Sequence, residues 1–216
     1  MKNTSKTEKA FLAIIAITGT FALIGQLWLI ILNRQTSVAE TIIRYLSFFT
    51  IECNILVTVA SAVILFVPLS KWGRFFSRPT TLCALTVYIF IVGLIYNLVL
   101  RQIWKPTGFQ MAVDELLHVV MPALFLIYWL LWAPKAGLNW NISRWLIYPA
   151  AYAIYTFIRG ALTGYYPYPF LDAGKFGTTQ TVLNTCGMVI VFLFFSLVFV
   201  FIGKIQTNRR LAGKVL

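Results

Sequence analysis

The residue types best suited to chemistry are gathered around the one histidine of the sequence. His118 lies in an otherwise apolar segment, Gln110–Trp132, and Asp114 precedes it by four residues. Residues four apart lie on the same face of a helix, so these two side chains can touch. A carboxylate beside an imidazole fixes its tautomer and makes it a stronger base. The pair predicts a site that handles protons, and Glu115 is a second acid that could orient the histidine.

Hydroxyl and amide side chains form a stripe in the segment 45–61. They recur at spacings of three or four residues, which places them on one face of a helix. Polar groups in hydrocarbon need partners, so this face is expected to point into the protein, as contacts between helices or as part of a site. Glu52 lies on another face, where we expect an arginine of a different helix to pair with it. The stripe consists of Ser47, Thr50, Asn54, Thr58 and Ser61.

Amide and guanidinium groups elsewhere supply further hydrogen-bond donors. Asn97 and Arg159 lie near the ends of two other apolar segments. Such groups can stabilise a developing oxyanion. We therefore expect Asn54, Asn97 and Arg159, together with Glu52, to bind substrate or stabilise an oxyanion. Either Glu52 or Asp114 could also pair with Arg159.

The composition assigns these residues to a membrane protein. The 216 residues are 60% hydrophobic and 11% charged, whereas about 25% of a soluble domain is charged. A helix needs roughly 20 apolar residues to cross a bilayer. We predict an all-α, polytopic membrane protein, with six transmembrane helices in a single domain over residues 1–216. Pro122 is expected to kink the fourth helix beside His118. The predicted helices span residues 11–32, 45–69, 80–101, 112–133, 145–163 and 181–203.

The distribution of the +12 net charge favours a membrane over a nucleic acid as partner. If the chain starts in the cytoplasm, twelve of the 18 Lys and Arg residues fall in cytoplasmic segments. Positive residues concentrate on that side of membrane proteins, so both termini are predicted to be cytoplasmic. The basic tail is expected to meet anionic headgroups, and no nucleic-acid motif accompanies it. The twelve are Lys2, Lys6, Lys9, Lys71, Arg74, Arg78, Lys135, Arg144, Lys204, Arg209, Arg210 and Lys214.

In this orientation, five helices bring polar groups to one layer in the outer third to half of the membrane. A base, an orienting carboxylate, a hydroxyl nucleophile and hydrogen-bond donors are the components of acyl transfer. A site inside a bilayer selects substrates that partition there, so lipid esters are the expected substrates and membrane lipids the expected partners. One histidine with scattered acids makes a poor metal site. Neither a metal nor another cofactor is expected.

Two other interpretations fit the same residues. Asp114, His118, Glu52 and Arg159 could form a proton or ligand relay in a proton-coupled transporter, a small-solute transporter or a lipid-binding protein. Inverted repeats with broken helices are typical of transporters, and the sequence shows none. Alternatively, the polar layer specifies helix packing alone.

Several motifs along residues 10 to 203 resemble one known family. The motifs are Tyr45–Asn54, Tyr96–Arg101 followed by Trp104, His118 followed by Pro122, and Arg159–Asp172. They are similar to a predicted six-transmembrane family that includes the androgen-induced-gene and androgen-dependent TFPI-regulating proteins.

The resemblance implies a specific chemistry. Members of the animal branch are described as intramembrane threonine hydrolases of fatty acid esters of hydroxy fatty acids, using one threonine and one histidine. By position, Thr50 resembles the nucleophile and His118 the base. The chain looks most like the bacterial branch, which implies a multi-pass protein of the bacterial plasma membrane.

Overall fold

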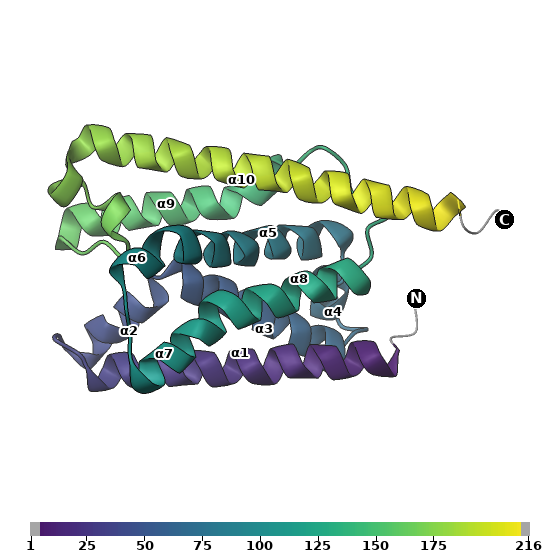
Figure 1. The fold of residues 1–216 in the computed structure, drawn as a ribbon, viewed down its shortest axis with the longest axis horizontal. Coiled ribbons are helices and arrows are strands. Elements are labelled where there is room, and N and C mark those ends of the chain that lie inside the picture. Colours follow the sequence, from purple (N-terminus) through teal and green to yellow (C-terminus); the bar gives the residue numbers. More distant parts are fainter. Residues whose placement is uncertain (1–4, 213–216) are drawn as a thin grey trace.

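Helices account for all the regular structure in residues 5–212, which are the residues that a computed structural model describes (Figure 1). Lys2 and Lys214, which contributed to the charge distribution above, lie outside this range. Symbols α denote α-helices, η1 and η2 are π-helices, and η3 is a 3-10 helix. The elements are α1 (Lys6–Leu32), α2 (Val38–Leu46), α3 (Phe49–Phe66), α4 (Lys71–Phe76), α5 (Pro79–Ile95), η1 (Tyr96–Leu100), α6 (Arg101–Ile103), α7 (Gly108–Glu115), η2 (Leu116–Val120), α8 (Met121–Leu131), α9 (Ser143–Thr163), η3 (Pro169–Leu171) and α10 (Ala173–Ala212).

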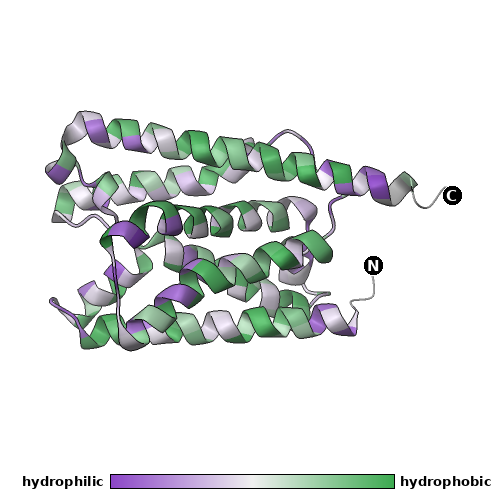
Figure 2. Cartoon of the chain, viewed as in Figure 1, coloured by the Kyte–Doolittle hydropathy of each residue, from purple (hydrophilic) through white to green (hydrophobic). Residues whose placement is uncertain are grey.

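Among the described residues, five helical stretches are long and apolar enough to cross a membrane. Figure 2 shows that hydrophobic residues cover most of their length, and that hydrophilic residues gather mainly towards the helix ends. This agrees with the expected all-helical, multi-pass architecture. The expected span 145–163 also folds as a helix, α9, but its arginines and tyrosines make it less apolar than the other five. The five stretches are Lys6–Leu32, Phe49–Phe66, Pro79–Ile103, Gly108–Leu131 and Ala173–Arg209.

Helix α5 forms the centre of the bundle. It packs against α3 and α8 on one side and against α10 on the other (Figure 1). Helix α1 packs mainly against α3 and also contacts α7 and α8. The core consequently lies around α5, whose residues from Leu82 to Val92 are almost all buried.

Helix α9 is attached to the bundle by long polar side chains. Tyr148 donates to the Glu52 carboxylate at 2.7 Å, and Tyr152 donates to the Ser47 carbonyl at 2.9 Å. One turn further, the Tyr155 hydroxyl lies 2.8 Å from the Ser47 hydroxyl. Because extended tyrosines make these contacts, the backbone of α9 stays at a distance from α3, which leaves space between them.

The expected helix 45–69 is interrupted, contrary to the prediction. Helix α2 ends at Leu46 and α3 begins at Phe49. The interruption lies at Ser47, whose hydroxyl donates to the Ile43 carbonyl and whose own carbonyl accepts from Tyr152. A carbonyl bound to a side chain of another helix needs no donor in its own helix, so the chain can change direction here.

The other expected boundaries also shift. Helix α10 begins at Ala173, eight residues before the expected start at 181, and its first turns are interrupted at Gly177, whose φ of 78° is the left-handed conformation that glycine adopts easily. The expected helix 112–133 is divided by η2, which is described with the site below.

Gly19 marks the closest approach of α1 to its neighbours. A Cβ atom at this position would overlap the Thr58 hydroxyl of α3 and lie 2.7 Å from Met121 Cε of α8. Small residues at helix crossings permit such close packing inside membranes. Gly187 of α10 offers a contrast, because a Cβ atom there meets nothing within 4 Å.

We predict that Gly19→Ala destabilises the protein by about 1–3 kcal/mol, the usual cost of overfilling a packed core. Gly187→Ala is the matched control and should leave the stability unchanged or raise it, because alanine forms helices more readily than glycine. Thermal unfolding of both variants in the same detergent provides the measurement. Equal midpoints for the two variants would contradict the close crossing.

Candidate functional site

His118 lies in the middle of a π-helical turn. In η2 the Met121 amide donates to the Leu116 carbonyl, five residues back, instead of to Leu117. Pro122 has no amide hydrogen, so it supplies no donor to the carbonyls of Leu117 or His118. The kink expected from Pro122 therefore takes the form of a π-turn, a feature that frequently accompanies functional sites.

Two asparagines of neighbouring helices occupy the carbonyls that Pro122 leaves without a donor. Asn54 Nδ2 donates to the Leu117 carbonyl at 3.2 Å, and also to the Thr50 carbonyl at 2.8 Å. Asn97 Nδ2 lies 3.5 Å from the His118 carbonyl and 2.7 Å from that of Gly93. An unpaired carbonyl in a membrane interior is costly, so these amides stabilise the turn that carries the histidine.

Tyr96 of η1 holds both members of the histidine–aspartate pair. Its ring stacks on the imidazole of His118, with centroids 3.9 Å apart and planes 17° from parallel. Its hydroxyl donates to the Asp114 carboxylate. The stacking restricts the imidazole plane, and the hydrogen bond holds the carboxylate beside it.

The geometry around His118 defines its tautomer. Nδ1 lies 2.9 Å from the backbone carbonyl of Asp114 and 3.7 Å from the Asp114 carboxylate oxygen Oδ1. A carbonyl can only accept, so Nδ1 carries the hydrogen in the neutral ring. Nε2 is then the nitrogen with a free lone pair, and it is the one that can take a proton from a substrate or a nucleophile.

Of the two acids near His118, Asp114 is the one in contact with the imidazole. Glu115 instead forms an ion pair with Arg101, at 2.7 Å between Oε1 and Nη1. Both side chains of that pair are partly exposed. The sequence left open that Glu115 orients the histidine. In the structure Glu115 pairs with Arg101, and Asp114 is the acid beside the ring.

Thr50 lies in the first turn of α3, where backbone amides have no acceptor in their own helix. The hydroxyl of Tyr168 takes that role, since the Thr50 amide donates to it at 3.1 Å. The same hydroxyl lies 3.2 Å from Thr50 Oγ1. Removal from water raises the pKa of Tyr168 to about 12, so the phenol keeps its proton at neutral pH and can donate it to Thr50 Oγ1. The hydrogen of the Thr50 hydroxyl then remains available for a base.

Thr50, Asp114 and His118 line one cavity of about 390 Å³. Its walls come from α1, α2, α3, η1, α6, α7, η2 and the loop around Tyr168, so the site is assembled from segments far apart in the sequence. Gln26 and Gln110 also line it, with the Gln110 amide donating to Gln26 at 2.9 Å.

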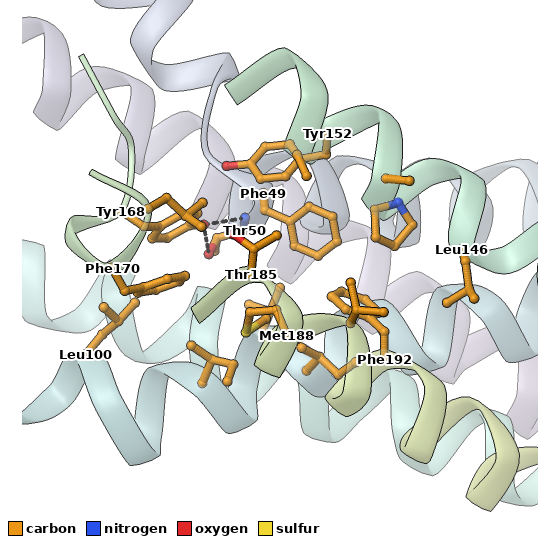
Figure 3. A pocket seen from close by; sticks show the side chains of 18 residues that line it. Phe49, Thr50, Leu100, Leu146, Tyr152, Tyr168, Phe170, Thr185, Met188 and Phe192 are labelled. Carbon is orange, nitrogen blue, oxygen red and sulfur yellow. Dashed lines mark hydrogen bonds between the residues drawn. The ribbon is translucent and has the colours of Figure 1, made fainter. Parts of the chain in front are cut away.

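Figure 3 shows a second cavity, whose walls include Thr50 and Tyr168 as those of the first cavity do. Its volume is about 210 Å³, and most of its walls are apolar side chains of α5, α9 and α10. Thr50, Leu100 and Tyr168 border both cavities. The Thr50 hydroxyl therefore lies where a mostly apolar space meets a more polar one.

The four residues expected to bind substrate or stabilise an oxyanion line neither cavity. Asn54 and Asn97 support η2, as described above. Glu52 accepts a hydrogen bond from Tyr148, so the prediction that an arginine pairs with it was wrong. Glu52 and Asp114 were possible partners of Arg159, but its ion pair is with Glu40 instead.

Arg159 instead joins α9 to α2. Its guanidinium lies 2.6 Å from the Glu40 carboxylate, which Arg44 also contacts at 2.8 Å. The hydrogen bond from Arg44, aided by that from Arg159, lowers the pKa of Glu40. The sequence interpretation missed this partner because it did not recognise α2 as a separate helix turned towards α9.

Sequence reasoning also missed Tyr96 and Tyr168 as parts of the site. Tyr96 is 22 residues from His118 in the chain and Tyr168 is 118 residues from Thr50. Spacing patterns within one helix cannot predict contacts between residues so far apart in the sequence. The prolines on either side of Tyr168 were a usable signal, because they restrict the backbone around that one side chain.

Comparisons of the chain with protein-family models, with curated proteins and with solved structures found no match.

We predict that neutral His118 carries its hydrogen on Nδ1. Because the chain has one histidine, ¹⁵N-histidine labelling of protein purified without a polyhistidine tag reports on this ring alone. At alkaline pH, where an imidazole is neutral, Nδ1 should give a protonated-type shift and Nε2 an unprotonated-type shift. The opposite assignment would contradict the hydrogen bond to the Asp114 carbonyl.

The support of η2 by Asn54 can be tested with a double-mutant cycle. Asn54→Ala should cost about 1–3 kcal/mol, because it leaves the buried Leu117 carbonyl without a donor. In a Pro122→Ala background, the backbone amide restored at position 122 can donate to the carbonyl that Asn54 no longer reaches. Asn54→Ala should therefore cost less stability in that background. Unfolding free energies of the four proteins in mixed micelles give the coupling. A coupling of zero would show that the two positions act independently.

Proposed function

We propose that this protein is an integral membrane hydrolase of lipid esters, such as fatty acid esters of hydroxy fatty acids, with Thr50 as nucleophile and His118 as general base. The observation that carries the proposal is the cavity lined by Thr50, Asp114 and His118, together with the apolar cavity on the other side of Thr50. A hydroxyl, a base and an orienting acid at the junction with an apolar space suit acyl transfer on a lipid.

In the first step the Thr50 oxygen attacks the carbonyl carbon of the ester while Nε2 of His118 takes the hydroxyl proton. The tetrahedral intermediate then collapses, the bond to the alcohol oxygen breaks, and His118 returns the proton to that oxygen. The products of this step are the free alcohol and a fatty acyl ester of Thr50. The Asp114 carboxylate, 3.7 Å from Nδ1, stabilises the imidazolium that exists between the two proton transfers.

In the second step His118 removes a proton from a water molecule, and the resulting hydroxide attacks the acyl-threonine. Collapse of this second intermediate breaks the bond to Thr50 Oγ1, which regains a proton from His118. The free fatty acid is released and the enzyme is restored. One base therefore serves both steps.

The first turn of α3 is the proposed oxyanion stabiliser, in place of the four residues named from the sequence. Thr50 is the second residue of this helix, so the backbone amides nearest to its hydroxyl are those without intrahelical acceptors. These amides and the positive end of the helix dipole favour negative charge beside Thr50. Tyr168 contributes a further phenolic hydrogen at the same place.

The proposal includes six membrane crossings in a bacterial plasma membrane, with both termini in the cytoplasm. Helix α9 has 21 residues, or about 30 Å at 1.5 Å per residue, which matches the hydrocarbon thickness of a bilayer. Both ends of the described chain lie at the same end of the bundle (Figure 1), as an even number of crossings requires. The excess of Lys and Arg in the segments at that end favours the cytoplasmic side.

Covalent labelling with a fluorophosphonate tests the nucleophile and the base together. Wild-type protein in detergent should be labelled on Thr50, Thr50→Ala should take no label at that site, and His118→Ala should react about 10²–10⁴ times more slowly, the usual contribution of a general base. Labelling is read by gel fluorescence, and the modified residue is identified by mass spectrometry.

Thr58→Ala is the matched control, since Thr58 lies two turns further along α3 and lines neither cavity. Its hydroxyl has no hydrogen-bond partner within the described residues, so its removal leaves no group unsatisfied. Thr58→Ala should be labelled like the wild type. Folded wild-type protein that takes no label and hydrolyses no lipid ester would refute the hydrolase proposal.

A further inference from the structure

The apolar cavity extends along α9 and α10. On α9 its lining residues extend from Ala153 to Leu146, and on α10 from Thr185 to Phe192. Each stretch rises by about 10 Å at 1.5 Å per residue. Figure 3 shows Thr50 and Tyr168 towards one end of this space and Leu146 towards the other. The space can therefore hold part of a hydrocarbon chain that ends at the Thr50 hydroxyl.

The position of His118 distinguishes the two cavities that share Thr50. His118 and Asp114 line the larger, more polar cavity and are absent from the walls of the apolar one. The alcohol oxygen that leaves the tetrahedral intermediate in the first step must receive its proton from His118. The leaving oxygen must therefore lie on the side of the polar cavity.

We infer that the apolar cavity between α5, α9 and α10 is the acyl-chain subsite, and that the alcohol part of the ester lies in the cavity lined by His118. This assignment rests on the proposed hydrolase function. It follows that the acyl chain stays in the apolar cavity after the alcohol departs, while water reaches the acyl-threonine through the polar cavity.

The assignment also defines the class of substrate. The part of the acyl chain nearest the ester is an unsubstituted hydrocarbon, because the walls beyond Thr50 and Tyr168 offer it almost only apolar contacts. The alcohol part carries polar groups, for which Gln26 and Gln110 supply amide donors and acceptors. Selectivity for chain length therefore belongs to the acyl side of the ester.

Two isomeric esters separate this assignment from its reverse. Ethyl hexadecanoate has a long acyl chain on a short alcohol, and hexadecyl acetate has a short acyl group on a long alcohol. Their composition is identical, so they enter detergent micelles to a similar extent. The wild type should hydrolyse ethyl hexadecanoate with the higher kcat/KM.

Ala153→Phe fills the apolar cavity from α9. It should lower kcat/KM for ethyl hexadecanoate by about tenfold or more, a usual effect when a hydrocarbon no longer fits its pocket, and should change that for hexadecyl acetate by less than about twofold. Ala151→Phe is the control, because Ala151 is exposed on α9 and lines neither cavity. Met188→Trp fills the same cavity from α10 and provides an independent test should Ala153→Phe fail to fold.

Each outcome has a defined meaning. Selective loss of ethyl hexadecanoate hydrolysis in Ala153→Phe or Met188→Trp supports the acyl-chain subsite. Equal losses for both esters in folded variants, or a selective loss for hexadecyl acetate, would overturn it while leaving the hydrolase proposal intact. A wild type that hydrolyses neither these isomers nor any other ester would remove the hydrolase proposal and the subsite with it.

Discussion

Backbone carbonyls inside a membrane bundle need donors, and around His118 the helix cannot supply them all, because Pro122 has no amide hydrogen. The chain forms the π-turn η2, and the side-chain amide of Asn54 donates from α3 to the buried Leu117 carbonyl. The same amide group binds the Thr50 carbonyl. One side chain thereby connects the backbone of the candidate nucleophile to the backbone of the candidate base, and the rest of the site depends on this connection.

Two tyrosines complete the arrangement from opposite sides. Tyr96 stacks on the imidazole and holds the Asp114 carboxylate, whereas Tyr168 caps the first turn of α3 beside Thr50. Neither is expected to form a covalent bond to substrate. Their role is to restrict the orientations of a histidine and a threonine that would otherwise sample several rotamers, and such preorganisation accounts for much of catalytic efficiency.

The attachment of α9 through tyrosine hydroxyls leaves room for the apolar cavity beside Thr50. Its tyrosines reach Ser47 and Glu52 through their hydroxyls, so the helix is anchored without its backbone packing closely against α3. Close packing there would close the apolar cavity that ends at Thr50. The polar stripe of α9 thus positions a helix and preserves a space beside it, which explains how a bundle with few residues can contain two adjoining cavities.

The sequence by itself determined the apolar, helical architecture typical of a membrane protein and the pairing of Asp114 with His118, since apolar run length and the spacing of four residues are local properties. Thr50 was selected as the candidate nucleophile from the family resemblance and not from spacing. Only the tertiary structure decided that Asn54 and Asn97 support η2, that Glu52 meets a tyrosine and that Arg159 meets Glu40. It also decided where the helix around Ser47 breaks and which cavities adjoin Thr50. The physical reason is that a polar side chain in a membrane must find a partner, while the identity of that partner depends on which helices become neighbours.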